Sequence, residues 1–486
     1  MKKWNIKEIV AYGMVVGSGI LFILLASSWT SPFFPGSYGY DASFFSMMGR
    51  AVIEGKVPYR DYFDLKGPAF FFLQAVGQLL IRDRGGVVLL QIVAISITGI
   101  ALYKICMVYI TKLQTVFVFL IFYFVYTTCL WGGNSVEELC MPFQMVCLYL
   151  GICYLEKEED ENIKGIALFF GISFAIMLFS KVTVAAPMIA VSITVFSRML
   201  HQKKLKEALQ CILYFLFGAA MITIPILVYF ITNGALKDMI FCVFQFAFQR
   251  STDYYEGFSL KWEKNLIVCY GAFFLFLFKW KQQDSIKWLL FHMSLVIFLL
   301  LHLGTPFAYY FITTLPLLCL LCIEFLREVN THKTEKPVKP MLFAELAILL
   351  VLFAYGNDTI QKMKDNLEIA FKETELAYYK DCIEIKDLIP ESERDEIYCL
   401  ESGMIFYEVN QMLPSNKYPV NLPYFMDLHP VIKKEVLHVI TEETPKWIIS
   451  EKFSDFDDDD VKIAVYNRYE MIASNSAEQL YRRMDE

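Results

Sequence analysis

The sequence lacks the short motifs that mark several familiar classes of pump and hydrolase. It has no P-loop glycine pattern, no GxSxG and no HExxH. Its 486 residues include only six histidines, and these are scattered. A nucleotide-driven pump or a zinc hydrolase therefore has no recognisable motif here, and a histidine-based metal site is not expected.

Charged residues are also scarce. They make up 20% of the chain, against about 25% in a typical soluble protein, and they are unevenly placed. Apolar runs of 15 or more residues recur as far as Tyr355 and carry almost no charge. This pattern predicts a polytopic α-helical membrane protein, whose spans contact the lipid bilayer. The net charge of −7 comes mostly from the C-terminal third and predicts no nucleic-acid partner.

About 11 membrane spans are predicted. A further apolar segment, from Pro68 to Ile81, is short for a full crossing and suits a re-entrant or interfacial helix. The first run follows a basic start without a small-residue cleavage site, so we interpret it as a retained anchor. The predicted spans are 10–29, 86–106, 113–131, 139–155, 164–179, 182–198, 207–231, 264–279, 285–303, 306–326 and 341–355.

The placement of basic residues predicts the orientation of these spans. If the segment from Pro68 does not cross, every strongly basic connection falls on the side of the N-terminus, which the positive-inside rule assigns to the cytoplasm. If it does cross, all of them move outside. We therefore expect a plasma-membrane protein with a cytoplasmic N-terminus and an external C-terminal tail. The basic positions are Lys104, Lys112, 201–207, Lys279, Lys281, Lys287 and 327–340.

Two domains are expected: a transmembrane domain over residues 1–355, with an external loop at 31–85, and an extracytoplasmic domain over 356–486. The tail has two short apolar runs, Glu396–Leu400 and Trp447–Ser450, that predict buried strands, and a helical pattern at Val431–Thr441. It therefore resembles a small α/β domain. Of 12 cysteines, ten lie in or beside apolar segments; Cys382 and Cys399 lie in the tail and can pair only in an oxidising compartment.

The external loop carries an unusual density of charge between apolar segments. Asp41 follows the first span and begins a helical pattern that ends at Glu54. It suits a general base that deprotonates an acceptor hydroxyl, and it equally suits a helix N-cap. Farther on, Arg60 and Lys66 are candidates for phosphate binding, with Asp61 and Asp64 beside them. Internal ion pairing among these four residues is the alternative.

Other external turns add candidate residues. Glu137 and Glu138 follow Asn134 at the outer start of a span, where the helix dipole favours carboxylates. They point about 100° apart, so one of them, with a slight preference for Glu138, can orient an acceptor, bind a metal or position a cation. The remaining candidates each have a simpler membrane-interface interpretation: they are Lys181 and Arg250 for a donor phosphate, and Tyr309 and Tyr310 for a substrate pocket.

The first loop resembles that of bacterial GT-C glycosyltransferases, and most closely the family 39 group that is similar to protein mannosyltransferases and includes aminoarabinose transferases. The resemblance rests on Asp41, Gly49-Arg50, Gly55, the run PYRDYFD at 58–64 and Lys66-Gly67-Pro68. Further matches are 134–138, Lys181, 306–310 with Leu315-Pro316, and in the tail 444–449 and 469–482. Two departures are Tyr309, where many relatives have histidine, and Gly67 in place of proline.

The resemblance implies a GT-C-like membrane domain and transfer of a sugar from a polyprenyl-phosphate donor, on the external face and with inversion. Asp41 matches the family's catalytic aspartate, Lys66 a basic residue near the donor phosphate, and Glu137 or Glu138 the acid of the second external loop. The acceptor is a glycan, lipid or protein. The scheme requires no cofactor, although the external acids are compatible with a divalent ion. The competing interpretations are a transporter, flippase or polymerase for lipid-linked glycans, and an inactive assembly subunit.

Overall fold

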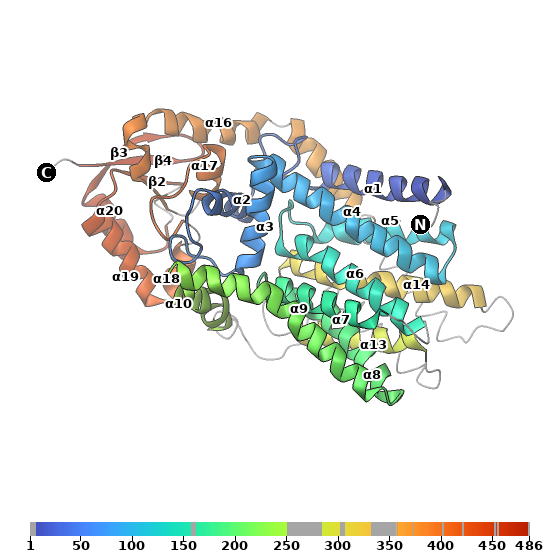
Figure 1. Cartoon of the computed structure of the whole chain (residues 1–486). Coiled ribbons are helices and arrows are strands. Elements are labelled where there is room, and N and C mark those ends of the chain that lie inside the picture. The colour runs from blue at the N-terminus through green and yellow to red at the C-terminus, as the bar shows by residue number, and fades with distance from the viewer. Residues whose placement is uncertain are drawn as a thin grey trace. The chain divides into compact units, whose positions relative to one another are not determined.

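The computed structural model describes residues 6–156, 162–249, 284–301, 307–331, 356, 358–371, 373–400, 403–419, 422–451, 453 and 456–484. Two predicted spans, 264–279 and 341–355, lie outside these residues, as does Arg250. The chain divides into two compact units. Unit 1 comprises Met1–Ser27, Leu90–Val228 and Ser251–Asn366, and unit 2 comprises Ser28–Leu89, Tyr229–Arg250 and Leu367–Glu486 (Figure 1).

Unit 1 is built from long apolar helices, as the sequence predicts. Within the described residues, seven helical stretches are long and apolar enough to cross a membrane, and some of the remaining apolar helices are shorter. The helices are α1 (Ile6–Ala26), most of α4 (Arg84–Tyr109), α5 (Lys112–Cys129), α6 (Val136–Glu156), α7 (Ile163–Leu178), α8 (Ala186–His201), most of α9 (Leu205–Thr232), α13 (Ser285–Leu301) and α14 (Leu315–Thr331). Short 3-10 turns, Val182–Ala185 and Ala308–Thr314, precede α8 and α14.

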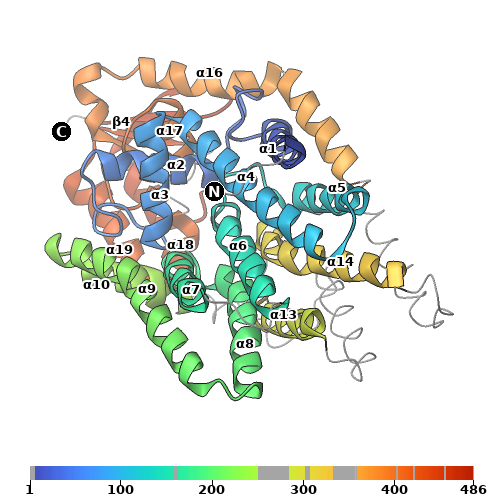
Figure 2. The same cartoon turned by 45° about the vertical axis from the view of Figure 1, so that its right-hand side comes forward.

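Small residues set the close packing of two of these helices. A Cβ on Gly171 of α7 would lie 1.9 Å from the carbonyl oxygen of Phe215 in α9, and one on Gly218 would lie 2.2 Å from that of Leu168. Only glycine therefore permits this approach, which is a common way for membrane helices to pack. Helices α6, α8 and α13 also pack together, and α14 packs on α5 (Figure 2).

Polar side chains gather at both ends of the unit 1 helices, in two separate groups. At one end Tyr109 donates to Glu156 at 2.8 Å, Arg327 pairs with Asp284, and Ser285 donates to the carbonyl of Leu155. The basic segment 201–207 follows α8 at this end, so helix ends that were predicted to share one side of the membrane do lie together. The glutamates of α6 and the turn before α8 lie at the opposite end.

Unit 2 contains the first external loop. Its helix α2 spans Tyr40–Ile53, which confirms the helix predicted from Asp41 to Glu54. Helix α3 spans Pro68–Leu80, and its 13 residues reach only about 20 Å against a hydrocarbon core of about 30 Å. A Cβ on Gly49 would lie 2.7 Å from the backbone carbon of Gln74, so glycine allows α2 to pack tightly on α3.

The tail contributes a small mixed sheet to unit 2, with strand order β1-β2-β4-β3 (Figure 1). Strands β1 (Ile397–Leu400) and β2 (Trp447–Ser450) are parallel and fully buried, which confirms both predicted strands. Strands β3 (Tyr469–Ser474) and β4 (Gln479–Arg483) complete it with antiparallel pairing. Unit 2 also contains α10 (Leu236–Ile240), from an earlier segment of the chain. The helices of the tail include α16 (Glu373–Asp387), α17 (Gly403–Val409), α18 (Leu422–Leu428), α19 (Pro430–His438) and α20 (Asp459–Tyr466).

The tail thus has the predicted α/β character, and the helix predicted at Val431–Thr441 is found as α19 with the π-helical turn that follows it. Cys382 and Cys399 are both buried free thiols. Unit 2 joins the tail from Leu367 with the first loop, so the tail and that loop share one folded unit. The linear boundary between 355 and 356 stays a prediction.

Candidate functional site

The candidate residues form two groups, one in each unit. The first-loop group lies in unit 2 and contains Asp41, Arg60, Asp61, Asp64 and Lys66. The second group lies in unit 1 and contains Asn134, Glu137, Glu138, Lys181, Tyr309 and Tyr310. Arg250 is outside the described residues, so its proposed contact with a donor stays a prediction.

Asp41 lies in the first turn of α2 and is not the N-cap. Gly39 holds the N-cap position, without a side-chain hydrogen bond. A Cβ on Gly39 would lie 2.1 Å from the indole of Trp29, so no larger residue fits there. The Asp41 carboxylate is partly exposed and forms no hydrogen bond or ion pair with the described residues. It is therefore available to an external proton donor.

Lys66 reaches the same face of α2. Its ammonium nitrogen lies 5.2 Å from the ring centroid of Phe45, and Phe45 follows Asp41 by one helical turn on the same face. The loop around Lys66 is fixed from two sides: its amide donates to Asp64 Oδ1 at 2.6 Å, and its carbonyl accepts from the Tyr59 hydroxyl at 2.7 Å. The loop thus holds the Lys66 ammonium against the helix that carries Asp41.

Arg60 and Asp61 behave as the alternative interpretation predicted, because they pair with each other. Arg60 Nε donates to Asp61 Oδ1 at 2.8 Å, and Asp61 Oδ2 also accepts from the Val57 amide at 2.6 Å. Burial raises the pKa of Asp61, but the hydrogen bonds from Arg60 and Val57 outweigh it and leave the pKa below its ordinary value. This carboxylate stays ionised and shapes the loop. Arg60 is exposed and also donates to the carbonyl of Asn233.

In the second group, Glu137 pairs with Lys181. Lys181 Nζ lies 2.5 Å from Glu137 Oε1. The same nitrogen is 3.1 Å from the ring centroid of Tyr310 and 5.3 Å from that of Tyr309. Glu137 is 1% exposed, and its second oxygen has no hydrogen-bond partner among the described residues. A buried carboxylate with one unused oxygen next to a cation and two aromatic rings is an arrangement suited to an anionic, hydroxyl-bearing ligand.

Glu138, in contrast, forms hydrogen bonds that hold the start of α6. Its Oε2 accepts from the Ser135 amide at 2.9 Å while its own amide donates to Ser135 Oγ at 3.3 Å, which forms a capping box at the start of α6. Its Oε1 accepts from Gln91 at 3.1 Å and from Tyr126 at 3.2 Å. Because both carboxylate oxygens of Glu138 already accept hydrogen bonds, Glu137 is the better candidate for contact with a ligand.

The turn before α6 has a backbone that requires glycine. Gly132, Gly133 and Asn134 all have positive φ, at 74°, 102° and 64°. A Cβ on Gly133 would lie 2.7 Å from Gln91 Nε2. The turn thus brings the amide of Gln91 against the Glu138 cap and leaves Asn134 buried beside it.

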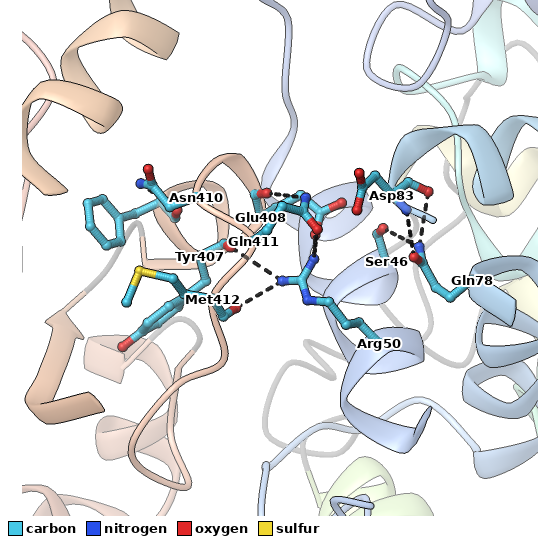
Figure 3. Close-up of polar contacts among 10 residues, drawn as sticks. Ser46, Arg50, Gln78, Asp83, Tyr407, Glu408, Asn410, Gln411 and Met412 are labelled. Atoms are coloured by element: carbon cyan, nitrogen blue, oxygen red, sulfur yellow. Dashed lines mark hydrogen bonds and ion pairs between the residues drawn. The ribbon is translucent and has the colours of Figure 1, made fainter. Parts of the chain in front are cut away.

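One set of contacts was not predicted from the sequence: Arg50 of α2 binds the C-terminal end of α17 and the residues that follow it (Figure 3). Arg50 Nη1 donates to Glu408 Oε2 at 3.0 Å and to Gln411 Oε1 at 2.7 Å. Its Nη2 donates to the carbonyls of Met412 at 2.9 Å and Tyr407 at 3.3 Å. The Gly49-Arg50 pair was visible in the sequence, but its partners lie more than 350 positions away.

Within the described ranges, no group of three or more His, Cys, Asp and Glu side chains is arranged to hold a metal ion. In the acidic run of the tail, Asp458 caps α20 by accepting from the Val461 amide. Lys433 pairs with Asp458 at 2.8 Å and with Asp460 at 2.7 Å.

The fold is similar to that of two solved structures of ArnT from Cupriavidus metallidurans. The structure bound to undecaprenyl phosphate aligns with a TM-score of 0.62 and 10% identity over 98% of each chain. The apo structure aligns with a TM-score of 0.59 and 10% identity over 98% of this chain and 97% of that one. At this identity the likeness establishes the fold, and it confirms the GT-C architecture that the first loop predicted.

The family model described as "Putative competence-induced protein Ccs4 N-terminal domain" matches residues 15–341. No curated protein matches the sequence.

Proposed function

We propose that this chain, which belongs to the family of the putative competence-induced protein Ccs4 N-terminal domain, is an integral membrane glycosyltransferase. It transfers a sugar from a polyprenyl-phosphate donor to an acceptor hydroxyl, with inversion at the anomeric carbon. The GT-C fold shared with ArnT supports the reaction class, and the undecaprenyl phosphate bound in the ArnT structure supports the kind of donor.

One observation carries this proposal: the Lys66 ammonium lies over Phe45, one helical turn from Asp41, whose carboxylate has no hydrogen-bond or ion-pair partner among the described residues. An acceptor hydroxyl has a pKa far above neutrality, so a positioned carboxylate can take its proton while attack proceeds. The leaving group is a lipid phosphate, which needs a cation more than a general acid. Direct displacement by one base and one cation inverts the anomeric carbon, and the first loop supplies both groups.

The other residues take supporting parts in the proposal. Within unit 1, Lys181, paired with Glu137, is the candidate cation for a donor phosphate. Asp61 and Asp64 shape the loop around Lys66, with Arg60 at its exposed edge. Tyr309, Tyr310 and Asn134 line the substrate pocket around the Lys181–Glu137 pair. Glu138 holds the start of α6 in place.

The proposed reaction takes place on the external face of the plasma membrane. Cysteines introduced in place of two exposed lysines test this orientation: Lys434→Cys on α19 of the tail and Lys206→Cys near the start of α9. In intact cells, an impermeant thiol reagent should label the first and spare the second, relative to the unmodified chain as background. Labelling of Lys206→Cys alone would reverse the orientation and place the candidate site inside.

The function itself is tested by mass spectrometry of envelope glycans, glycolipids and glycoproteins from a strain that lacks the chain. We expect one defined sugar mass to disappear from one class of acceptor and to return when the gene is restored. The missing mass identifies the sugar and the acceptor together. An envelope with every glycan intact, or an unmodified lipid-linked glycan trapped on the cytoplasmic leaflet, would contradict the proposal, the latter in favour of a flippase.

A further inference from the structure

An exposed aromatic surface borders the Lys181–Glu137 pair in unit 1. The indole of Trp131 is 49% exposed, and its ring centroid lies 5.8 Å from that of Tyr309 and 6.1 Å from that of Phe307. The rings of Phe307 and Tyr309 are nearly parallel, with centroids 5.7 Å apart and planes 4° from one another. Trp131 immediately precedes the two-glycine turn that leads to α6.

This surface is continuous with charged groups. Tyr309, which contacts Trp131, also lies 5.3 Å from Lys181 Nζ, and Lys181 pairs with the buried Glu137. An ammonium group has three N–H donors, so Lys181 retains capacity for a second acceptor beyond Glu137. Unit 1 therefore contains a chain of successive contacts that runs from an exposed indole through a stacked pair of rings to a cation and a buried carboxylate.

We infer that Trp131, Phe307 and Tyr309 form a stacking platform for the sugar ring of the lipid-linked donor, with Lys181 meeting the phosphate that carries this sugar. The inference rests on the proposed function and assigns a contact with the donor sugar to residues of unit 1 alone. The face of an aromatic ring is electron-rich, and it attracts the weakly positive C–H groups on the flat side of a pyranose. In a sugar phosphate the ring and the anion are joined directly, so their site must set an aromatic face beside a cation.

Anchoring to lipid is the simpler explanation for an exposed tryptophan at a membrane surface. Lipid anchoring requires only an amphipathic side chain and gives no reason for the rings to continue to a lysine paired with a buried carboxylate. The two explanations also differ in chemistry. Leucine preserves contact with lipid tails but removes the aromatic face, whereas phenylalanine preserves both.

The experiment uses the purified full chain in lipid nanodiscs and two ligands, undecaprenyl phosphate and undecaprenyl phosphate that carries one hexose. We expect Trp131→Leu to weaken binding of the hexose-bearing lipid roughly 3- to 10-fold and to leave binding of the bare lipid unchanged. Trp131→Phe should bind the hexose-bearing lipid within about 2-fold of the native chain. The bare lipid and the Phe variant together separate a lost sugar contact from a misfolded protein.

Each other outcome has a distinct meaning. Equal weakening of both lipids by Trp131→Leu would show a contact with lipid or phosphate and would overturn the platform. Unchanged binding of both lipids by this variant would overturn it as well, while the proposed function stands. If the native chain binds neither of the two lipids, the proposed function is wrong, and so is the platform.

Discussion

Replacement of Asp41 by asparagine is expected to lower sugar transfer by about 100- to 10,000-fold. Asparagine has the shape of aspartate but does not accept the acceptor's proton at neutral pH. Since Asp41 forms no hydrogen bond or ion pair with the described residues, the exchange removes only the interaction of its charge with the N-terminus of α2, worth about 0.3–1 kcal/mol. The variant should therefore reach near-native abundance and melt within a few degrees of the native chain.

The measurement is restoration of the missing sugar by each variant in a strain that lacks the chain, with protein levels matched. Asp238→Asn is a suitable control, because Asp238 is an aspartate of the same unit in a half-exposed pair with Lys417 at 3.4 Å. It should restore transfer fully. If Asp41→Asn also does so, Asp41 is not the base, and the chemical step must depend on another carboxylate.

Replacement of Arg50 by methionine is expected to destabilise the fold by about 3–5 kcal/mol. The guanidinium is 8% exposed and donates four hydrogen bonds to the α17 region, while its partner Glu408 is 1% exposed. Burial raises the pKa of Glu408, although Arg50 acts in the opposite direction. Without Arg50 this carboxylate stays buried and loses the cation that pairs with it among the described residues.

Thermal unfolding of the purified chain in detergent measures this effect. Arg60→Met is the matched control, because Arg60 forms an exposed pair with Asp61 that is worth at most about 1 kcal/mol. A double variant, Arg50→Met with Glu408→Leu, should recover much of the lost stability, since it removes both buried charges. Equal melting temperatures for Arg50→Met and Arg60→Met would show that the buried pair contributes little.

The sequence was sufficient for elements defined by local patterns. The runs at Glu396–Leu400 and Trp447–Ser450 predicted two buried strands, and both were found, at Ile397–Leu400 and Trp447–Ser450. Helix α2 was predicted from the pattern that begins at Asp41, and the flanking Gly39 and Gly55 explain its limits. Strand β3 was not predicted as a strand, because most of its residues are exposed and show no alternation.

The candidate site was less predictable for two physical reasons. The choice between Glu137 and Glu138 depends on helix capping, and the pattern Ser135-x-x-Glu138 is a capping box that assigns Glu138 to the backbone. This pattern is visible in the sequence alone. The pairing of Arg50 with Glu408 joins residues 358 positions apart, and no local pattern of charge or hydropathy indicates such a partner.

The Arg50 contacts also bear on how much of this chain can be studied alone. The region matched by the family model, 15–341, contains the guanidinium but ends well before residues 407–412, which accept its hydrogen bonds. A fragment cut to that region would lack all four acceptors of the Arg50 guanidinium and would uncover the part of α2 that packs on α17. The helix that carries Asp41 therefore depends on the last fifth of the polypeptide, and fragments intended for binding or crystallisation should retain it.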